Sequence, residues 1–140
     1  MSGTLVSEYR PVIETSEIYT NGNRYEGEKK ETLRHGKGKY MYNDGSHYFG
    51  DWVKGKMEGQ GELIDTDGNL VYEGQWKDDH YEGKGRLMGR GSDWTKYEGE
   101  FRGGRMEGFG EMWFYDGRRF KGQFRNDIPH GKGRMFMNNS

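Results

Sequence analysis

A short motif returns five times along the chain: an aromatic residue, any residue, glycine and a further polar residue. The five copies begin at Tyr25, Tyr48, Tyr72, Tyr97 and Phe120, and successive copies lie 23, 24, 25 and 23 positions apart. Such a short period is the signature of a repeat protein, in which each unit buries its apolar face only by stacking on its neighbours. The chain is therefore expected to fold as an array of similar units and not around one globular core.

Each unit also carries a Gly-x-Gly pair, always 11 positions after its first aromatic residue. The interval from this pair to the next unit varies from 10 to 12 positions. A constant interval predicts a hairpin of fixed register, and a variable one predicts a link that tolerates insertions. Asp-Gly, a strong turn signal, stands in this link at residues 44–45, 67–68 and 116–117, and residues 89–93 replace it with a longer loop.

The alternation within each unit predicts which residues form the core. Side chains two positions apart share one face of a strand, so the first aromatic residue, the glycine and a second ring lie together. Glycines at fixed positions leave room for these rings to lie against the backbone. The predicted core residues are Tyr48, Trp52, Tyr72, Trp76, Tyr97, Phe101, Phe120, Phe124, Gly59, Gly61, Gly83, Gly85, Gly108 and Gly110.

Two apolar columns run through the second strands of the units, on opposite faces. One has the parity of the glycines and is expected to complete the core: Tyr40, Leu63, Leu87, Met112 and Met135. The other is the candidate interface with a protein partner: Met41, Ile64, Met88, Trp113 and Phe136. Trp and Phe are favoured interface anchors. The alternative is that this second column is the core and that the other face is solvated.

The array is expected to be irregular at its start. Residues 18–22 align with residues 41–45, which makes half a unit, and the first full unit has Lys29 where the others have Trp or Phe. Atypical terminal units are common caps in repeat proteins. We therefore expect an extended N-terminal arm over residues 1–17 and an array over 18–140. The array would hold a half repeat at 18–24 and full repeats that begin at residues 25, 48, 72, 97 and 120.

Composition agrees with a thin sheet. Hydrophobic residues make up only 30% of the chain, but aromatic residues reach 15% and glycines number 25. That is too little aliphatic material for a thick core and too many rings for a disordered chain. The fold class expected is all-β: an elongated, single-layer, twisted antiparallel sheet of tandem β-hairpins.

Charge and hydropathy limit the partners and the compartment. A net charge of −1 gives no field that would attract nucleic acid. The chain has no cysteine, and it has no apolar run near the ~20 residues that a membrane-spanning helix needs. Its first ten residues lack the apolar region of a secretory signal. An intracellular, cytoplasmic protein is expected.

No constellation of residues predicts catalysis, a cofactor or a metal. His35 and His130 occupy the same place in units four repeats apart, so one chain cannot bring them to a shared metal. Gly36-Lys37-Gly38 lacks the Ser or Thr and the following helix of a phosphate loop. The repeated carboxylates would lie on an open sheet without the cleft that a glycosidase requires. The chain is not expected to be an enzyme.

Basic residues gather at both ends of the array, and acidic residues gather in its middle. Solvated surface charge is the ordinary explanation for such a distribution. A contact site for an anionic lipid or an acidic partner is the alternative, by analogy with polybasic lipid recognition. The residues predicted for it are Arg118, Arg119, Lys121 and Arg125.

The motif resembles the MORN (membrane occupation and recognition nexus) repeat. The resemblance covers about residues 18–140 and is strongest at residues 72–76, Tyr-Glu-Gly-Gln-Trp, and 83–85, Gly-Lys-Gly. It implies stacked hairpins that act as a non-enzymatic scaffold for protein–protein interaction in a larger assembly. A cytoskeletal or ciliary assembly, such as a radial spoke, and a homodimer would both fit this implication. The alternative implied by the family is a peripheral module that binds phosphoinositides on a membrane.

Overall fold

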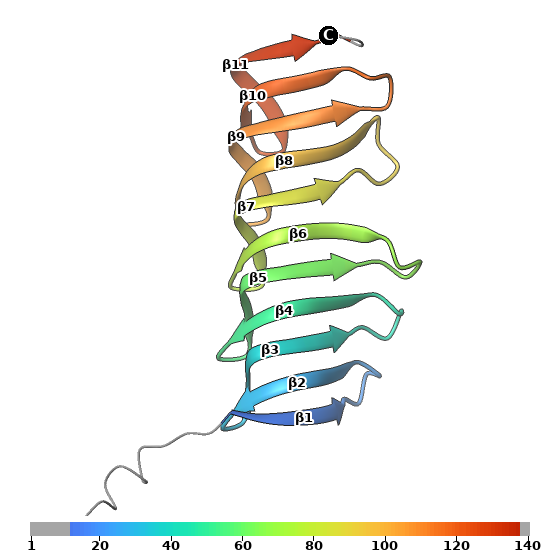
Figure 1. Cartoon of the computed structure of the whole chain (residues 1–140), viewed down its shortest axis with the longest axis vertical. Helices are drawn as coiled ribbons and strands as arrows, with labels where there is room; N and C mark the ends of the chain where they lie inside the picture. Colours follow the sequence, from blue (N-terminus) through green and yellow to red (C-terminus); the bar gives the residue numbers. More distant parts are fainter. Residues whose placement is uncertain (1–11, 138–140) are drawn as a thin grey trace, which may run out of the picture.

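The computed structural model describes residues 12–137 and shows one antiparallel sheet of eleven strands, with every strand beside its neighbour in sequence. Figure 1 shows the strands stacked along the long axis of the molecule, with the first and last strands at opposite ends. The all-β, single-layer class predicted from the sequence is confirmed. The strands are β1 (Val12–Ile18), β2 (Arg24–Lys30), β3 (Leu33–Met41), β4 (His47–Val53), β5 (Lys56–Ile64), β6 (Leu70–Lys77), β7 (His80–Met88), β8 (Trp94–Arg102), β9 (Arg105–Phe114), β10 (Arg119–Arg125) and β11 (Ile128–Phe136).

Two kinds of turn alternate along the sheet. Within each unit, a two-residue turn joins the first and second strands; in the β4–β5 and β6–β7 hairpins both turn residues have positive φ, as a type I′ turn requires. Between units, longer turns contain the Asp-Gly dipeptides. From the β4–β5 hairpin onward, each two-residue turn also donates a backbone hydrogen bond to the hairpin before it. For example, the Gly55 amide donates to the carbonyl oxygen of Arg34 at 2.8 Å.

The first glycine of each Gly-x-Gly pair has a positive φ, which only glycine adopts without strain. Register shifts occur in the hairpins opposite these positions, for example between Gly50 and Trp52, where β4 pairs with β5. Such bulges bend a strand and increase its twist. The Gly-x-Gly pairs therefore determine the bend of each hairpin and do not form a binding loop.

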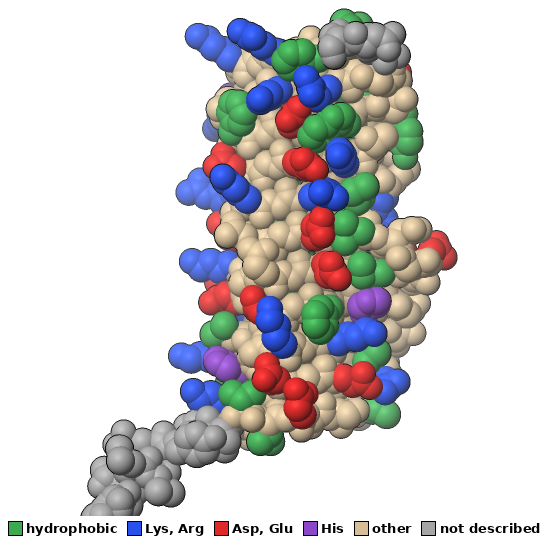
Figure 2. Space-filling view, viewed as in Figure 1, with side chains coloured by type: hydrophobic (Ala, Val, Ile, Leu, Met, Phe, Trp, Pro, Cys, Tyr) green, Lys and Arg blue, Asp and Glu red, His purple; other side chains and the backbone are tan. Residues whose placement is uncertain are grey.

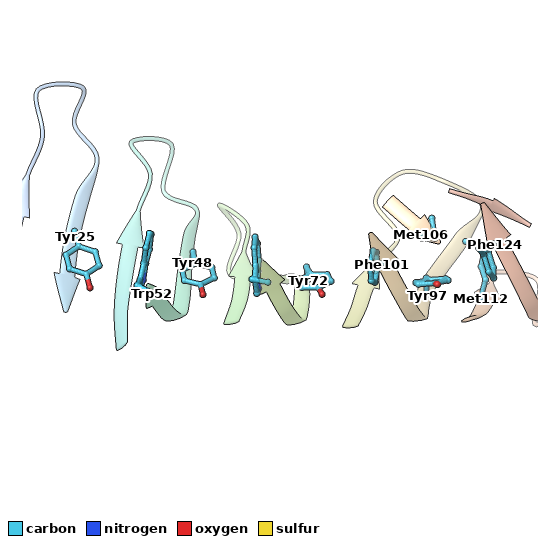
Figure 3. Close-up of a cluster of buried hydrophobic side chains, with 10 residues drawn as sticks. Tyr25, Tyr48, Trp52, Tyr72, Tyr97, Phe101, Met106, Met112 and Phe124 are labelled. Carbon is cyan, nitrogen blue, oxygen red and sulfur yellow. The ribbon is translucent and has the colours of Figure 1, made fainter. Parts of the chain in front are cut away.

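The core is a row of aromatic rings on one face of the sheet, which we call the aromatic face. Tyr25, Tyr48, Tyr72 and Tyr97 are completely buried, and Figure 3 shows them in a line with their neighbouring rings. A Cβ added at Gly61 would lie 2.4 Å from the Tyr48 ring, so the second glycine of each pair is a steric requirement. Each tyrosine hydroxyl donates to a backbone carbonyl three residues on, as Tyr48 does to Asp51 at 2.7 Å.

In the second, third and fourth units, the second ring packs edge-on against tyrosines of two units. Trp76 lies 5.3 Å from Tyr72 of its own unit and 5.0 Å from Tyr48 of the unit before, with the ring planes nearly perpendicular. Edge-to-face pairs of this kind are favourable beyond their buried area. Of the rings predicted to lie against glycine, the tyrosines do so, whereas the Trp76 indole nitrogen donates to the carbonyl of Gly61 at 3.0 Å.

The last unit is less completely buried than the others. Phe120, which stands where the other units have tyrosine, is only half-buried. Its ring contacts Phe124 of its own hairpin at 5.6 Å, whereas each core tyrosine also meets a ring of the following unit. The reason is positional, because no hairpin follows β11 in the described part of the chain.

The sheet begins earlier than expected. Residues 12–18 form β1, which pairs along its whole length with β2, so the predicted arm over 1–17 is wrong for residues 12–17. The alignment of residues 18–22 with 41–45 holds in the structure, because both segments run from a strand end into a turn. The half unit therefore consists of β1 and the turn that follows it. Residues 1–11 of the predicted arm lie outside the described residues.

The first unit replaces part of the ring core with a cation. The Arg34 guanidinium lies 4.9 Å from the centre of the Trp52 ring and 5.1 Å from that of Tyr40. It occupies the repeat position of Met57, and it donates to the Tyr19 hydroxyl at 3.1 Å. Lys29, which stands in place of Trp, donates to Glu17 on β1 at 2.7 Å. These contacts close the N-terminal end of the aromatic face.

Candidate interaction surfaces

The face opposite the aromatic core, which we call the charged face, carries the predicted apolar column and part of the predicted basic cluster. The cross-strand pairs place Met41 beside His47 and His47 beside Ile64. Farther along, the same row contains Met88, Lys96 and Trp113. Figure 2 shows this face, with hydrophobic side chains in a column beside a column of charged ones.

His47 and Leu70 lie between the first members of the apolar column, and Lys96 and Arg119 lie between the later ones, so only the C-terminal half of the row alternates with cations. The five members of the column, Met41, Ile64, Met88, Trp113 and Phe136, are all partly buried, and none belongs to the buried core. The alternative that this column is the core is thus wrong, because the completely buried rings all belong to the aromatic face.

Two of the cations lie directly on rings of the column. The Lys96 ammonium is 4.5 Å from the centre of the Trp113 ring, and the Arg119 guanidinium is 4.4 Å from that of Phe136. Such contacts shield part of each ring from water and add a modest attraction. The C-terminal part of the row is thus a mixed aromatic and cationic strip, which suits a partner that offers apolar and acidic groups together.

The middle of the charged face is acidic and hydrogen-bonded. Arg86 bridges two carboxylates, Glu73 at 3.3 Å and Glu98 at 3.0 Å. Glu111 extends this group and pairs with Arg119 at 3.1 Å. A shallow hollow of about 720 Å³ lies over this region and is lined by these carboxylates together with Lys84 and Lys121. It is open and amphoteric, so it offers no enclosed site for a reaction.

A second hollow, of about 700 Å³, lies over the last hairpin and is basic. Its charged lining residues are Lys121, Lys132 and Arg134, and Phe109 and Phe136 complete it. No carboxylate lines it. The sequence placed Lys132 and Arg134 in the basic C-terminal cluster, but only the strand pairing shows that they share one hollow with Lys121.

The four cations predicted for a lipid or acidic partner do not form one site. Arg118 pairs with Asp116 at 2.7 Å and stacks on Phe114, which packs against the aromatic core. Arg119 points to the charged face, and Arg125 lies at the far end of β10 near His130. Of the four, only Lys121 lines the basic hollow. Adjacent strand residues face opposite sides, which explains why neighbours in sequence separate in the structure.

Several carboxylates that drew attention in the sequence have a structural task. Glu28 accepts a hydrogen bond from the Lys37 amide at 2.6 Å, and Asp51 accepts one from the Gln60 amide at 2.8 Å. Gln75 does the same for the Lys84 amide at 2.7 Å, so the place requires an acceptor and not a charge. Sequence reasoning missed this role, although the mixture of Glu, Asp and Gln at one repeat position is the signal that indicates it.

The strongest pKa shifts belong to the core and not to a reactive centre. Burial raises the pKa of Tyr25 to about 12 and raises the pKa values of Tyr48, Tyr72 and Tyr97 further. These tyrosines are held neutral and bonded to backbone carbonyls, so they are unsuited to proton transfer at neutral pH. Over residues 12–137 we find no group of three or more His, Cys, Asp or Glu side chains that could hold a metal ion. The same residues include no helix able to cross a bilayer.

The fold and these surfaces define a repetitive β-sheet protein that presents open faces and edges. Its five repeats also match a known family. The family model of the MORN repeat matches residues 25–47, 48–70, 72–92, 97–118 and 120–140, which is most of the chain, and the matches begin at the five residues where the repeats were placed. The chain therefore belongs to the MORN repeat family.

Similar proteins share these repeats and differ in what accompanies them. MORN repeat-containing protein 3 of Xenopus laevis is 42% identical over 71 residues, which cover 46% of this chain and 30% of that protein. Phosphatidylinositol 4-phosphate 5-kinase 1 of rice (Oryza sativa subsp. japonica) is 49% identical over 41 residues, 29% of this chain and 5% of the kinase. Human alsin is 32% identical over 93 residues, 63% of this chain and 6% of alsin. The chain thus spans less than a third of the length of each.

Proposed function

We propose that this chain is a non-enzymatic scaffold module that binds a protein partner through its charged face. The observation that carries the proposal is the row of Met88, Lys96, Trp113, Arg119 and Phe136, in which rings and cations alternate outside the core. None of these side chains belongs to the buried row of rings. Partly exposed aromatic and arginine side chains are the usual anchors of protein interfaces. On the family resemblance alone, we further propose that the assembly is cytoplasmic and belongs to the cytoskeleton or to a cilium.

A site-specific crosslinking experiment tests this proposal. A photoreactive phenylalanine analogue is placed at Met88 in living cells, and the matched control carries it at Lys54, an exposed turn position. The proposal expects a discrete protein adduct from position 88 that disappears when Trp113 is changed to Ser, while the melting temperature stays unchanged. Equal labelling from both positions, or labelling that survives Trp113→Ser, contradicts it.

The second candidate is an anionic membrane surface, and the basic hollow favours it. Lys121, Lys132 and Arg134 line this hollow without an opposing carboxylate. Vesicles that contain a phosphoinositide should then bind the chain at low salt and release it as salt rises. Lys121→Glu with Arg134→Glu should abolish binding, and Lys54→Glu with Lys56→Glu should not. Absence of binding at low salt removes this candidate and leaves the scaffold proposal untouched.

A further inference from the structure

The outer edge of β11, which we call the terminal edge, is where the repeat pattern stops in the described part of the chain. The strands β3, β5, β7 and β9 are each covered by the first strand of the following unit. β11 is the second strand of its unit, and within residues 12–137 it pairs with β10 alone. All of its residues except Phe136 are exposed. Unpaired strand edges are templates for pairing with another chain.

The sequence of β11 indicates what would pair with it. Residues 131–135 read Gly-Lys-Gly-Arg-Met, and residues 83–87 of β7 read Gly-Lys-Gly-Arg-Leu. β7 is covered by β8, and the register sets Lys84 opposite Glu100 and Arg86 opposite Glu98. Arg86 forms an ion pair with Glu98 at 3.0 Å. A strand with the pattern of β8 would therefore meet Lys132 and Arg134 with the same charge complementarity.

A place for an aromatic ring is also open at this edge. In the interior, Tyr72 receives the Phe101 ring of the next unit at a centroid distance of 5.2 Å, and Tyr97 receives Phe124 at 4.9 Å. Phe120 stands at the same repeat position, contacts Phe124 of its own hairpin and is half-buried. A strand bound to β11 could cover the outer side of Phe120 with its own ring.

Pro129 limits which strands can pair with β11, because it lacks an amide hydrogen. The Met57 and Met106 amides donate to aspartates in the turn of the following hairpin, Asp79 and Asp127. Pro129 holds the same repeat position and has no amide hydrogen to donate. The turn after β8 makes no such demand, because its glycines, Gly103 and Gly104, have no side chain to accept an amide hydrogen. The Gly104 amide still donates to the carbonyl oxygen of Tyr81 at 3.0 Å. Pro129 has a carbonyl, so it suits a β8-type segment followed by glycines.

We propose that the terminal edge binds an extended segment of another protein by strand addition. The segment carries the pattern aromatic, acidic, glycine, acidic, aromatic, and it pairs antiparallel to β11 with its acidic residues opposite Arg134 and Lys132. Backbone hydrogen bonds supply affinity in such complexes, and the side chains supply specificity. A second copy of the chain is a poor source, because β2, β4, β6, β8 and β10 are each paired on both sides. This edge adjoins the charged-face row proposed above and shares Phe136 with it.

A peptide with the chain's own sequence over residues 94–104 is the probe. The chain should bind it with 1:1 stoichiometry, and amide hydrogen exchange should slow in residues 131–136. Lys132→Glu with Arg134→Glu should weaken binding by about tenfold or more. The matched control, Lys54→Glu with Lys56→Glu, makes the same change of charge at exposed positions and should bind as the unmodified chain does.

A charge swap keeps the test decisive. A peptide with lysine in place of Glu98 and Glu100 should bind the charge-reversed chain better than the unmodified one. Melting curves of each variant establish that the sheet is intact. Absence of saturable binding at millimolar peptide overturns the proposal. Affinity that is indifferent to both charge reversals also overturns it, as does slowed exchange in β1 instead of β11. None of these results decides the charged-face proposal, which is tested separately by crosslinking from Met88 and by Trp113→Ser.

Discussion

The indole nitrogen of Trp52 donates a hydrogen bond of 3.0 Å to the carbonyl oxygen of Gly38, which lies in the preceding hairpin. Trp76 repeats this bond with Gly61. The bond joins consecutive units, and the Trp52 ring that donates it is only 3% exposed. Phe101 and Phe124 fill the same place in later units without a donor. Cohesion between units is therefore expected to be stronger in the N-terminal half of the array.

Trp52→Phe tests this bond. The variant keeps an aromatic ring but leaves the Gly38 carbonyl without its indole donor, so we expect a loss of about 1–3 kcal/mol in the free energy of unfolding. Trp113→Phe is the matched control, because Trp113 lies on the charged face outside the core, and it should change stability by less than about 0.5 kcal/mol. Urea unfolding measures both. Equal losses at the two positions would mean that ring size, and not the hydrogen bond, determines the result.

The opposite experiment adds a hydrogen bond to the last unit. Phe120 occupies the position of the four core tyrosines, and Tyr97 there donates to the Glu100 carbonyl at 2.8 Å. Phe120→Tyr should place a hydroxyl near the carbonyl of Gln123 and raise stability by about 0.5–1.5 kcal/mol. Tyr97→Phe should lower stability by a similar amount or more. Destabilisation by Phe120→Tyr would show that the last hairpin does not share the geometry of the others.

The sequence predicted most of this fold because the repeat fixes it. A constant interval of 11 positions set the register of each hairpin, and alternation assigned Tyr48 and Trp52 to one face. The role of the first strand could not be predicted in the same way. Val12–Ile18 carries no glycine pair and no ring, so only its pairing with β2 reveals it as a strand.

The interaction surfaces were less predictable than the core. The apolar column was visible as a periodic pattern, but its alternation with Lys96 and Arg119 depends on which strands lie side by side. Arg118 and Arg119 are neighbours in sequence and stack on rings of opposite faces. Adjacent strand residues lie on opposite faces, so strand parity, and not clustering in the sequence, determines which cations share a surface.

High pH should unfold the array through its tyrosines. Burial raises the pKa of Tyr25 to about 12, and the pKa values of Tyr48, Tyr72 and Tyr97 are raised still further above the ordinary value of 10. A raised folded pKa gives stability that is fully present below pH 10 and is lost as the pH rises through the folded pKa. Circular dichroism between pH 9 and 12.5 should show a cooperative transition. Tyr115→Phe, at a position that is 69% exposed, should leave this transition unchanged, whereas Tyr48→Phe should shift it to higher pH.

Low pH should reduce the stability of the fold partly through protonation of Asp51. Burial alone would raise the pKa of this carboxyl, but the Lys37 ammonium and the Gln60 amide outweigh burial and hold it below its usual value. A lowered folded pKa gives stability that is present above the unfolded pKa and is lost as the pH falls through the folded value. Asp51→Asn keeps an acceptor for the Gln60 amide, as Gln75 does for Lys84, and should remove this part of the acid sensitivity. Urea unfolding at pH 7 and pH 3 measures the difference. An unchanged acid dependence in the variant would contradict the assignment.

Arg34 should tolerate substitution less well than the other residues of the N-terminal unit. Its guanidinium lies over the Trp52 and Tyr40 rings and donates to the Tyr19 hydroxyl and to the Gly55 carbonyl at 3.3 Å. Arg34→Lys keeps the charge but loses the planar fork that makes these contacts together, so we expect a loss of about 1–3 kcal/mol.

Arg34→Met should lose less than Arg34→Lys, because Met57 and Met106 fill the same repeat position, and an apolar replacement of similar volume leaves no buried charge. Lys37→Arg, at an exposed position of the same strand, is the control and should be neutral within about 0.5 kcal/mol. Thermal and urea unfolding of the three variants give the ranking. If Arg34→Lys equals the unmodified chain, the cation alone is sufficient. If Arg34→Met is the least stable variant, the charge itself is required to hold β1 on the array through Tyr19.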